Sequence, residues 1–131
     1  MDIITSKDWR KINEIIYKMN AEQDSRKAME VFLKETHSVI EYERASILLY
    51  SIKDGQYEVE CFIGDNLSDK VMSDYEDYYY QLDDVMKHMH QNIHEVSKST
   101  DVFDYEERMK TEFYQDFTRP YGAHYSIDGG F

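Results

Sequence analysis

The sequence is poor in the features that place a chain outside the cytoplasm or inside a membrane. Its one cysteine, Cys61, cannot form a disulfide within the chain, which suits a reducing compartment. The longest apolar run, Ile47–Tyr50, is far shorter than the roughly 18 residues that a membrane span needs. The first residues lack the basic start and apolar block of a signal peptide. We therefore expect a cytoplasmic protein that does not enter a membrane.

Basic residues are also scarce. Fifteen lysines and arginines are scattered among 27 aspartates and glutamates, so the formal net charge is -12 and no basic stripe forms. Such a surface repels phosphate backbones and anionic lipid headgroups. We expect no nucleic-acid contact by this segment itself.

The remaining composition is that of a folded domain. The chain has 131 residues, of which 41% are hydrophobic and 15% aromatic, enough to bury a core. It contains no internal repeat, linker or low-complexity stretch. These properties predict a single domain over residues 1–131.

The clearest local pattern predicts a β-hairpin. Ala45–Ile52 is β-rich and apolar on both faces, as in a central strand, and Tyr57–Ile63 alternates between apolar and polar residues. The four residues between them include Gly55 and form a turn. Before the hairpin, apolar residues at helical spacing predict two helices, the first around Trp9 and the second opening at Asp24 or Ser25.

After the hairpin, helical patterns predominate. A long apolar seam starts near Ser68, and the pair Asp83-Asp84 is expected to interrupt it and to cap a shorter helix toward Gln91. The later expectations are a strand at 92–96, a loop at 97–100, a helix at 106–117 ended by proline, and a third strand at 122–127. Strands grouped with helices predict an α+β fold.

No pattern argues for catalysis or for a bound cofactor. His88, His90 and His94 cluster, and two of them would share a helical face, but Asn92 is expected to end the helix between them. No cysteine lies near enough to complete a metal site, so we expect no metal ion. Cys61 lies on the apolar face of its strand without a neighbouring base, and no phosphate-binding or nucleophile motif occurs. We therefore expect that the protein is not an enzyme.

Tyrosine is unusually frequent. The chain has 12 tyrosines, four of them within residues 75–80. Tyr75, Tyr79 and Asp83 are four residues apart and would stack on one helical face. Because a tyrosine ring is apolar and its hydroxyl polar, this face either lines a small-molecule pocket or packs with its hydroxyls in water. The pattern leaves both interpretations open.

Two segments carry a resemblance to a known family. Residues 75–83 read Y-x3-Y-x3-D, and residues 113–122 read F-Y-x-x-F-x-x-P-x-G. With the order of helices, hairpin, helical crossover and returning strand, they resemble the N-terminal GAF-like sensor of LuxR-type helix-turn-helix regulators. The resemblance covers about residues 27–131, although Asp84 stands where the family has proline. It implies a GAF-like antiparallel sheet with helices on its faces, in a sensory domain for transcription regulation and signal transduction.

The resemblance also implies a ligand and a mechanism. An unidentified small-molecule effector would bind between the sheet and the helical crossover and change the dimer or its linkage to a DNA-binding domain. The expected pocket wall consists of Tyr50, Cys61, Tyr75, Tyr79, Asp83, Tyr114 and Phe117. Asp83 is either a polar anchor or a helix cap. The alternatives are a ligand-free dimerisation or interaction module and, third, a metal-dependent enzyme that uses the histidine cluster.

The end of the sequence adds one more expectation. In the family, further strands, a closing helix and a helix-turn-helix follow the strand expected at 122–127, so we expect a fragment truncated after the third or fourth strand. An edge left unpaired must be covered or paired. We therefore expect a homodimer or strand exchange at that edge.

Overall fold

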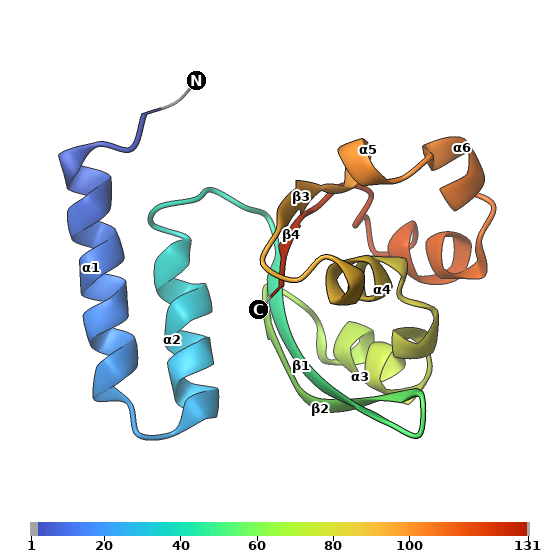
Figure 1. Cartoon of the computed structure of the whole chain (residues 1–131), viewed down its shortest axis with the longest axis horizontal. Helices are drawn as coiled ribbons and strands as arrows, with labels where there is room; N and C mark the ends of the chain where they lie inside the picture. Colours follow the sequence, from blue (N-terminus) through green and yellow to red (C-terminus); the bar gives the residue numbers. More distant parts are fainter. Residues whose placement is uncertain (1–2, 131) are drawn as a thin grey trace. The chain divides into compact units, whose positions relative to one another are not determined.

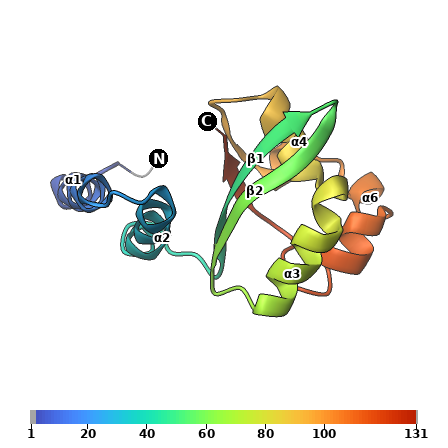
Figure 2. The same ribbon diagram turned by 90° about the horizontal axis from the view of Figure 1, so that it is seen from below.

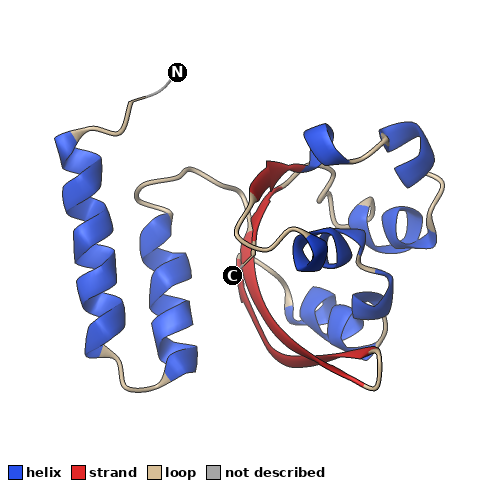
Figure 3. Cartoon of the chain, viewed as in Figure 1, coloured by secondary structure: helices blue, strands red, loops and turns tan. Residues whose placement is uncertain are grey.

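The computed structural model describes residues 3–130 and has a mixed α+β fold (Figure 3). The chain divides into two compact units, Met1–Met72 and Ser73–Phe131, which are described one at a time (Figure 1). That the chain forms one domain stays a prediction. None of the helices in residues 3–130 has the length and apolar content that crossing a bilayer requires.

The first unit opens with two helices, α1 (Ser6–Ala21) and α2 (Ser25–Thr36), as the sequence predicts. Thr5 caps α1, because its hydroxyl accepts from the Asp8 amide while the Asp8 carboxylate accepts from the Thr5 amide. Asp24 caps α2 through its carboxylate, which accepts from the amides of Arg26 and Lys27 in the first turn. The two helices lie side by side (Figures 1 and 2).

The predicted hairpin follows and is confirmed. Strands β1 (Ala45–Lys53) and β2 (Gln56–Asp65) pair antiparallel, and α2 packs against both. Asp54 and Gly55 close the turn with φ angles of 52° and 76°, the left-handed pair that a two-residue hairpin turn needs. Leu49 lies opposite Cys61 and Tyr50 opposite Val59, so β2 carries one extra residue there as a bulge.

The hairpin does not occupy the centre of a larger sheet. Among residues 3–130, β1 pairs with β2 and with no other strand, so the prediction of a central strand is wrong. Apolar residues on both faces of a strand indicate cover above and below it, and they do not require a second neighbour at its edge. One face of the hairpin is covered by α2.

The second unit is built from short helices. The helix α3 (Asp69–Asp77) crosses the boundary between the units, and a 3₁₀ helix, η1 (Tyr79–Leu82), and α4 (Asp84–Gln91) follow it. The predicted interruption at Asp83-Asp84 is confirmed. The predicted continuous helix at 106–117 is wrong: the chain forms α6 (Tyr105–Arg108) and then a π-helix, η2 (Phe113–Thr118).

The break in that helix has a local cause in Thr111. Its hydroxyl donates to the carbonyl of Arg108 and accepts from the amide of Tyr114. In a continuous α-helix the Arg108 carbonyl would accept from the Glu112 amide, and the Tyr114 amide would donate to the Lys110 carbonyl, so the Thr111 hydroxyl competes with both bonds. The helix restarts with wider turns, so Phe113 and Tyr114 are both buried.

The predicted third strand is displaced. Strand β4 is Ile127–Gly129 and pairs antiparallel with β3 (Val96–Lys98), forming a two-stranded sheet separate from the hairpin. The Tyr105 hydroxyl donates to the carbonyl of His124, which lies in the predicted strand, so that carbonyl is not used in a ladder. The predictions at 92–96 and 97–100 are shifted as well, because β3 starts at Val96 and α5 (Ser99–Val102) follows directly.

Candidate functional site

Aromatic rings of the second unit gather around Phe117. Its ring centroid lies 5.7 Å from that of Tyr75, 5.0 Å from Tyr79, 5.3 Å from Phe113 and 5.1 Å from Tyr121. These rings come from α3, η1, η2 and the turn after η2. We call these five residues the aromatic cluster.

Carboxylates border the aromatic cluster and accept from its hydroxyls. The Tyr75 hydroxyl donates to Asp83 Oδ2 at 2.6 Å, and the Tyr121 hydroxyl donates to Asp74 Oδ2 at 2.7 Å. Tyr78, whose ring contacts Tyr79, donates to Glu112 at 2.6 Å. The cluster is therefore a buried to half-buried group of rings, bordered by carboxylates that accept hydrogen bonds.

The two carboxylate oxygens of Asp83 accept different hydrogen bonds. Its Oδ1 accepts from the Met86 amide at 3.1 Å and so caps α4, while its Oδ2 accepts from Tyr75. Burial of the carboxyl group raises the pKa of Asp83, although these hydrogen bonds act in the opposite direction. The helix-cap role left open by the sequence is present, and it links α3 to the start of α4.

The structure brings some of the predicted pocket residues together and separates others. Tyr75, Tyr79, Asp83 and Phe117 form one connected group. The prediction that the first three stack on one helical face is wrong, because α3 ends at Asp77, Tyr79 lies in η1 and Asp83 caps α4. Tyr114, on the next face of η2, instead contacts His124 through its hydroxyl at 2.9 Å.

The other two predicted pocket residues belong to the first unit. The ring of Tyr50 lies against that of Tyr57 at 5.5 Å, and Cys61 Sγ accepts from Arg26 Nη1 at 3.4 Å. A role for these two side chains in the same pocket stays a prediction.

A second group of side chains was not predicted from the sequence. The Arg108 side chain is only 5% exposed, and it pairs with Asp84 through two hydrogen bonds, Nε to Oδ2 at 2.7 Å and Nη2 to Oδ1 at 3.0 Å. Its third nitrogen donates to the Tyr105 hydroxyl at 3.0 Å, and its Cζ lies 4.6 Å from the centroid of the Phe103 ring. Such fork-shaped pairing fixes both side chains.

Hydrogen bonds extend this group to β4. The Tyr105 hydroxyl oxygen also lies 2.7 Å from the oxygen of the buried Ser99 hydroxyl, and Ser99 accepts from the Ser126 amide at 3.0 Å. Ser126 donates in turn to the Asp128 carboxylate. Burial raises the pKa of Asp128, while Ser126, Arg108 and His88 oppose that rise. We call Asp84, Ser99, Tyr105, Arg108 and Asp128 the arginine cluster.

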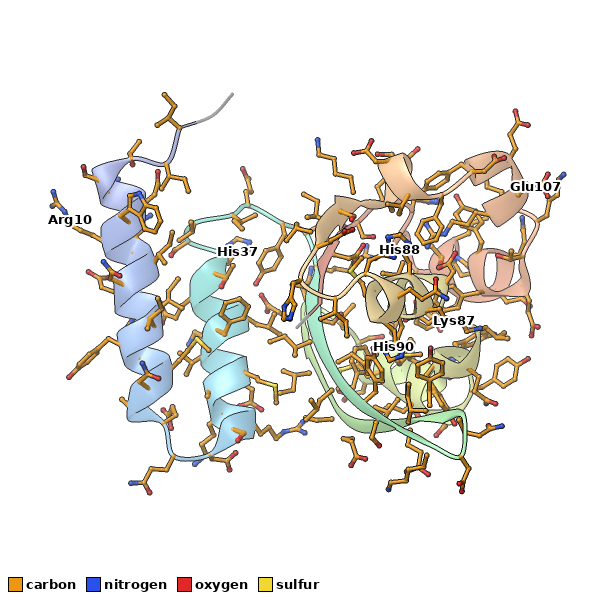
Figure 4. The ribbon with its side chains drawn as sticks, in the orientation of Figure 1. Arg10, His37, Lys87, His88, His90 and Glu107 are labelled. Atoms are coloured by element: carbon orange, nitrogen blue, oxygen red, sulfur yellow. The ribbon has the colours of Figure 1, made fainter. Side chains whose placement is uncertain are left out.

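The three histidines do not form a metal site. Helix α4 ends at Gln91 with Asn92 as its C-cap, as predicted, and His94 follows with a φ of 73°. Figure 4 shows His88 and His90 leaving α4 in opposite directions. Within residues 3–130, no group of three or more His, Cys, Asp or Glu side chains is placed to hold a metal ion.

His88 is nevertheless unusual. Its Nε2 is buried and has no hydrogen-bond partner among the described residues, and its ring meets Phe103 edge to face at 5.9 Å. Leaving such an atom unpaired costs about 1–3 kcal/mol. The sequence shows only three nearby histidines and gives no sign that one of them is enclosed beside Phe103.

Arg108 also gives little signal in the sequence. It follows Glu106 and Glu107, which predicts an ordinary exposed helical surface, whereas Asp84 is visible only as half of a capping pair.

The comparisons with protein-family models, curated proteins and solved structures found no match to this chain.

Proposed function

We propose that the chain is a GAF-like sensory domain that binds a small molecule at the aromatic cluster. The observation that supports this is the connection of Tyr75, Tyr79 and Phe117 with the enclosed carboxylate of Asp83. An apolar wall with a few polar anchors is the usual composition of small-molecule sites. The effector would be a flat ring that stacks on these side chains.

The border of the cluster selects the chemistry of the effector. Asp74, Asp83 and Glu112 all accept hydrogen bonds there, and each carries a carboxylate. A ligand that bears N–H or O–H donors satisfies these acceptors, whereas an anionic ligand is repelled. We therefore propose a neutral or cationic aromatic effector.

Asp83 provides the route for a response. A ligand donor that replaces the Tyr75 hydroxyl at Asp83 Oδ2 would shift the carboxyl group whose Oδ1 caps α4. The next residue, Asp84, holds Arg108, so a shift at the start of α4 reaches the arginine cluster. In a LuxR-type regulator, such a population shift would pass to a DNA-binding module elsewhere in a longer protein.

A second function is a ligand-free dimerisation or interaction module. It is favoured by the pairing of the hydroxyls of Tyr75, Tyr78 and Tyr121 with carboxylates, together with the packing of the rings on one another. In that case the cluster is filled by its own side chains and serves only stability.

Thermal-shift measurements distinguish the two functions. The probes are tyramine and adenine, with 4-hydroxyphenylacetate as the anionic match of tyramine. A ligand of the folded state raises the melting temperature by mass action. We expect a donor-bearing cationic or neutral ring to raise it and the anion to have no effect.

Variants tie any shift to the cluster. Tyr79→Ala removes a ring that contacts Phe117, and we expect it to abolish the shift. Tyr125→Ala removes a tyrosine that is 73% exposed and outside the cluster, and we expect it to leave the shift intact. If no ring compound shifts the wild type, the interaction module is the better reading. An equal loss in both variants places the site elsewhere.

A further inference from the structure

Helix α1 carries an exposed stripe without charge. Ser6, Trp9, Asn13, Ile16 and Asn20 are all exposed, and they follow one another at intervals of three and four residues. Trp9 is 53% exposed and Ile16 is 51% exposed. Alternating steps of three and four keep residues on one side of a helix, the spacing by which two helices pack along a shared seam. We call these five residues the neutral stripe.

The neutral stripe is distinct from the side of α1 that packs on α2. Ile15 is the buried residue of α1, and Lys11 and Lys18 reach across to Ser38 and Glu35. These residues lie on a different face from Trp9 and Ile16 at 100° per residue. In Figure 2, seen nearly along the axis of α1, α2 is the one element of the first unit beside it.

The absence of charge on this stripe is unexpected in such a chain. Charged residues make up 32% of the sequence, and α1 itself carries Lys7, Asp8, Arg10, Lys11, Glu14 and Lys18. All of them avoid the stripe. An exposed face that combines a tryptophan and an isoleucine and excludes charge has the composition of an interface centre.

The distribution of charge selects the partner. Residues 1–36 contain seven basic and seven acidic residues, so the net charge of -12 arises entirely in residues 37–131. Two copies of this chain repel each other through those later residues, and the repulsion is least where the balanced helices meet. A strongly basic partner would instead be drawn to the acidic remainder.

We infer that the neutral stripe is a homodimer interface in which α1 of one copy packs against α1 of a second. The 16 residues of α1 give a seam about 24 Å long. Two α1–α2 pairs then form a four-helix bundle, with Trp9 and Ile16 at its centre. Asn13 and Asn20 of each copy hydrogen-bond through their side-chain amides to asparagines of the other copy, which favours one register of the two α1 helices. This inference does not depend on the proposed ligand site.

The unique tryptophan of the chain reports on this interface directly. Trp9 is the one tryptophan of the sequence, so its emission is not masked by others. We expect sedimentation velocity to give twice the monomer mass of 15.7 kDa at high concentration. We also expect the Trp9 emission to move to shorter wavelength over the same concentrations, because the indole leaves water.

Two glutamate variants on α1 test the location. Ile16→Glu puts a charge in the neutral stripe, and we expect it to weaken dimerisation at least about tenfold. Ala21→Glu makes the same charge change at an exposed position of α1 outside the stripe, and we expect less than about a twofold effect. Circular dichroism verifies that both variants keep their helices.

Three outcomes overturn the inference. The first is a wild type that stays monomeric with an unchanged Trp9 spectrum. The second is a dimer that Ile16→Glu and Ala21→Glu weaken equally. The third is a dimer that forms without a shift of the Trp9 emission, which places the contact on another surface, such as a strand edge.

Discussion

At the scale of single residues, Arg108 is the side chain whose loss we expect to be most costly. Its guanidinium is enclosed, forms two bonds to Asp84 and lies over the Phe103 ring. Arg108→Ala leaves the Asp84 carboxylate, which is 27% exposed, without its counter-charge. Breaking one side of a buried pair costs about 3–5 kcal/mol. We expect a loss of about 3 kcal/mol in the free energy of unfolding, measured by urea denaturation.

A second arginine of the same unit provides the control. Arg119 is exposed and donates to Gln115 Oε1 at 3.2 Å on the surface, so Arg119→Ala should change stability by less than about 0.5 kcal/mol. Arg108→Lys keeps the charge but loses the fork, and we expect an intermediate loss. Equal losses for Arg108→Ala and Arg119→Ala would contradict the structural role of the arginine cluster.

Residue-level prediction from the sequence succeeds where the signal is local. Asp83 is recognisable as a helix cap because a cap needs only its own next turn. Its neighbour Asp84 looks the same in the sequence, yet its partner Arg108 lies 24 positions away. Tyr75 and Tyr79 were singled out by their spacing and both lie in the aromatic cluster, but they do not share a helical face, because α3 ends at Asp77 and Tyr79 belongs to η1. The arginine cluster was missed because no short-range pattern encodes it.

At the scale of elements, the hairpin turn offers a clean test of backbone conformation. Gly55 has a φ of 76°, and a Cβ added there would meet no atom within 4 Å. Any cost of Gly55→Ala therefore comes from the left-handed backbone and not from a clash. That conformation costs a residue with a Cβ roughly 1–2 kcal/mol. We expect a loss of about 1 kcal/mol in the free energy of unfolding, measured by thermal denaturation.

Asparagine at the same position separates conformation from other effects. It tolerates the left-handed region better than alanine, so Gly55→Asn should cost less than Gly55→Ala. The opposite order of the two variants would mean that the turn does not limit stability.

The elements differ in how far the sequence could predict them. The hairpin and the first two helices were predicted because turn residues, alternation and caps act within a few positions. The C-terminal strand was misplaced because the position of β4 depends on β3, about 30 residues earlier, and on the Tyr105 hydroxyl that takes the His124 carbonyl. The π-helix depends on Thr111, whose residue type alone does not predict a helix break.

At the scale of the whole molecule, the excess of negative charge makes stability depend on pH. A net charge of -12 destabilises the compact state through repulsion, which acid and salt both reduce. Asp83 and Asp128 add to this effect, because burial raises the pKa of each above the ordinary value of 3.8. The folded state then binds protons more tightly than the unfolded state between 3.8 and the raised values, so stability falls as pH rises through that window.

Asp128→Asn isolates the buried part of this dependence. Asparagine cannot ionise, so the variant no longer buries a charge beside Asp84 and Ser126 as the pH rises. Asp54→Asn removes the same formal charge from the exposed hairpin turn. The test is the free energy of unfolding between about pH 4 and pH 8, at low salt and at about 1 M NaCl, where repulsion between exposed charges is screened. We expect the free energy of unfolding to decline with pH in high salt for the wild type and Asp54→Asn, and to decline less for Asp128→Asn. Equal slopes of this free energy against pH in the two variants would show that Asp128 titrates as an exposed carboxyl group.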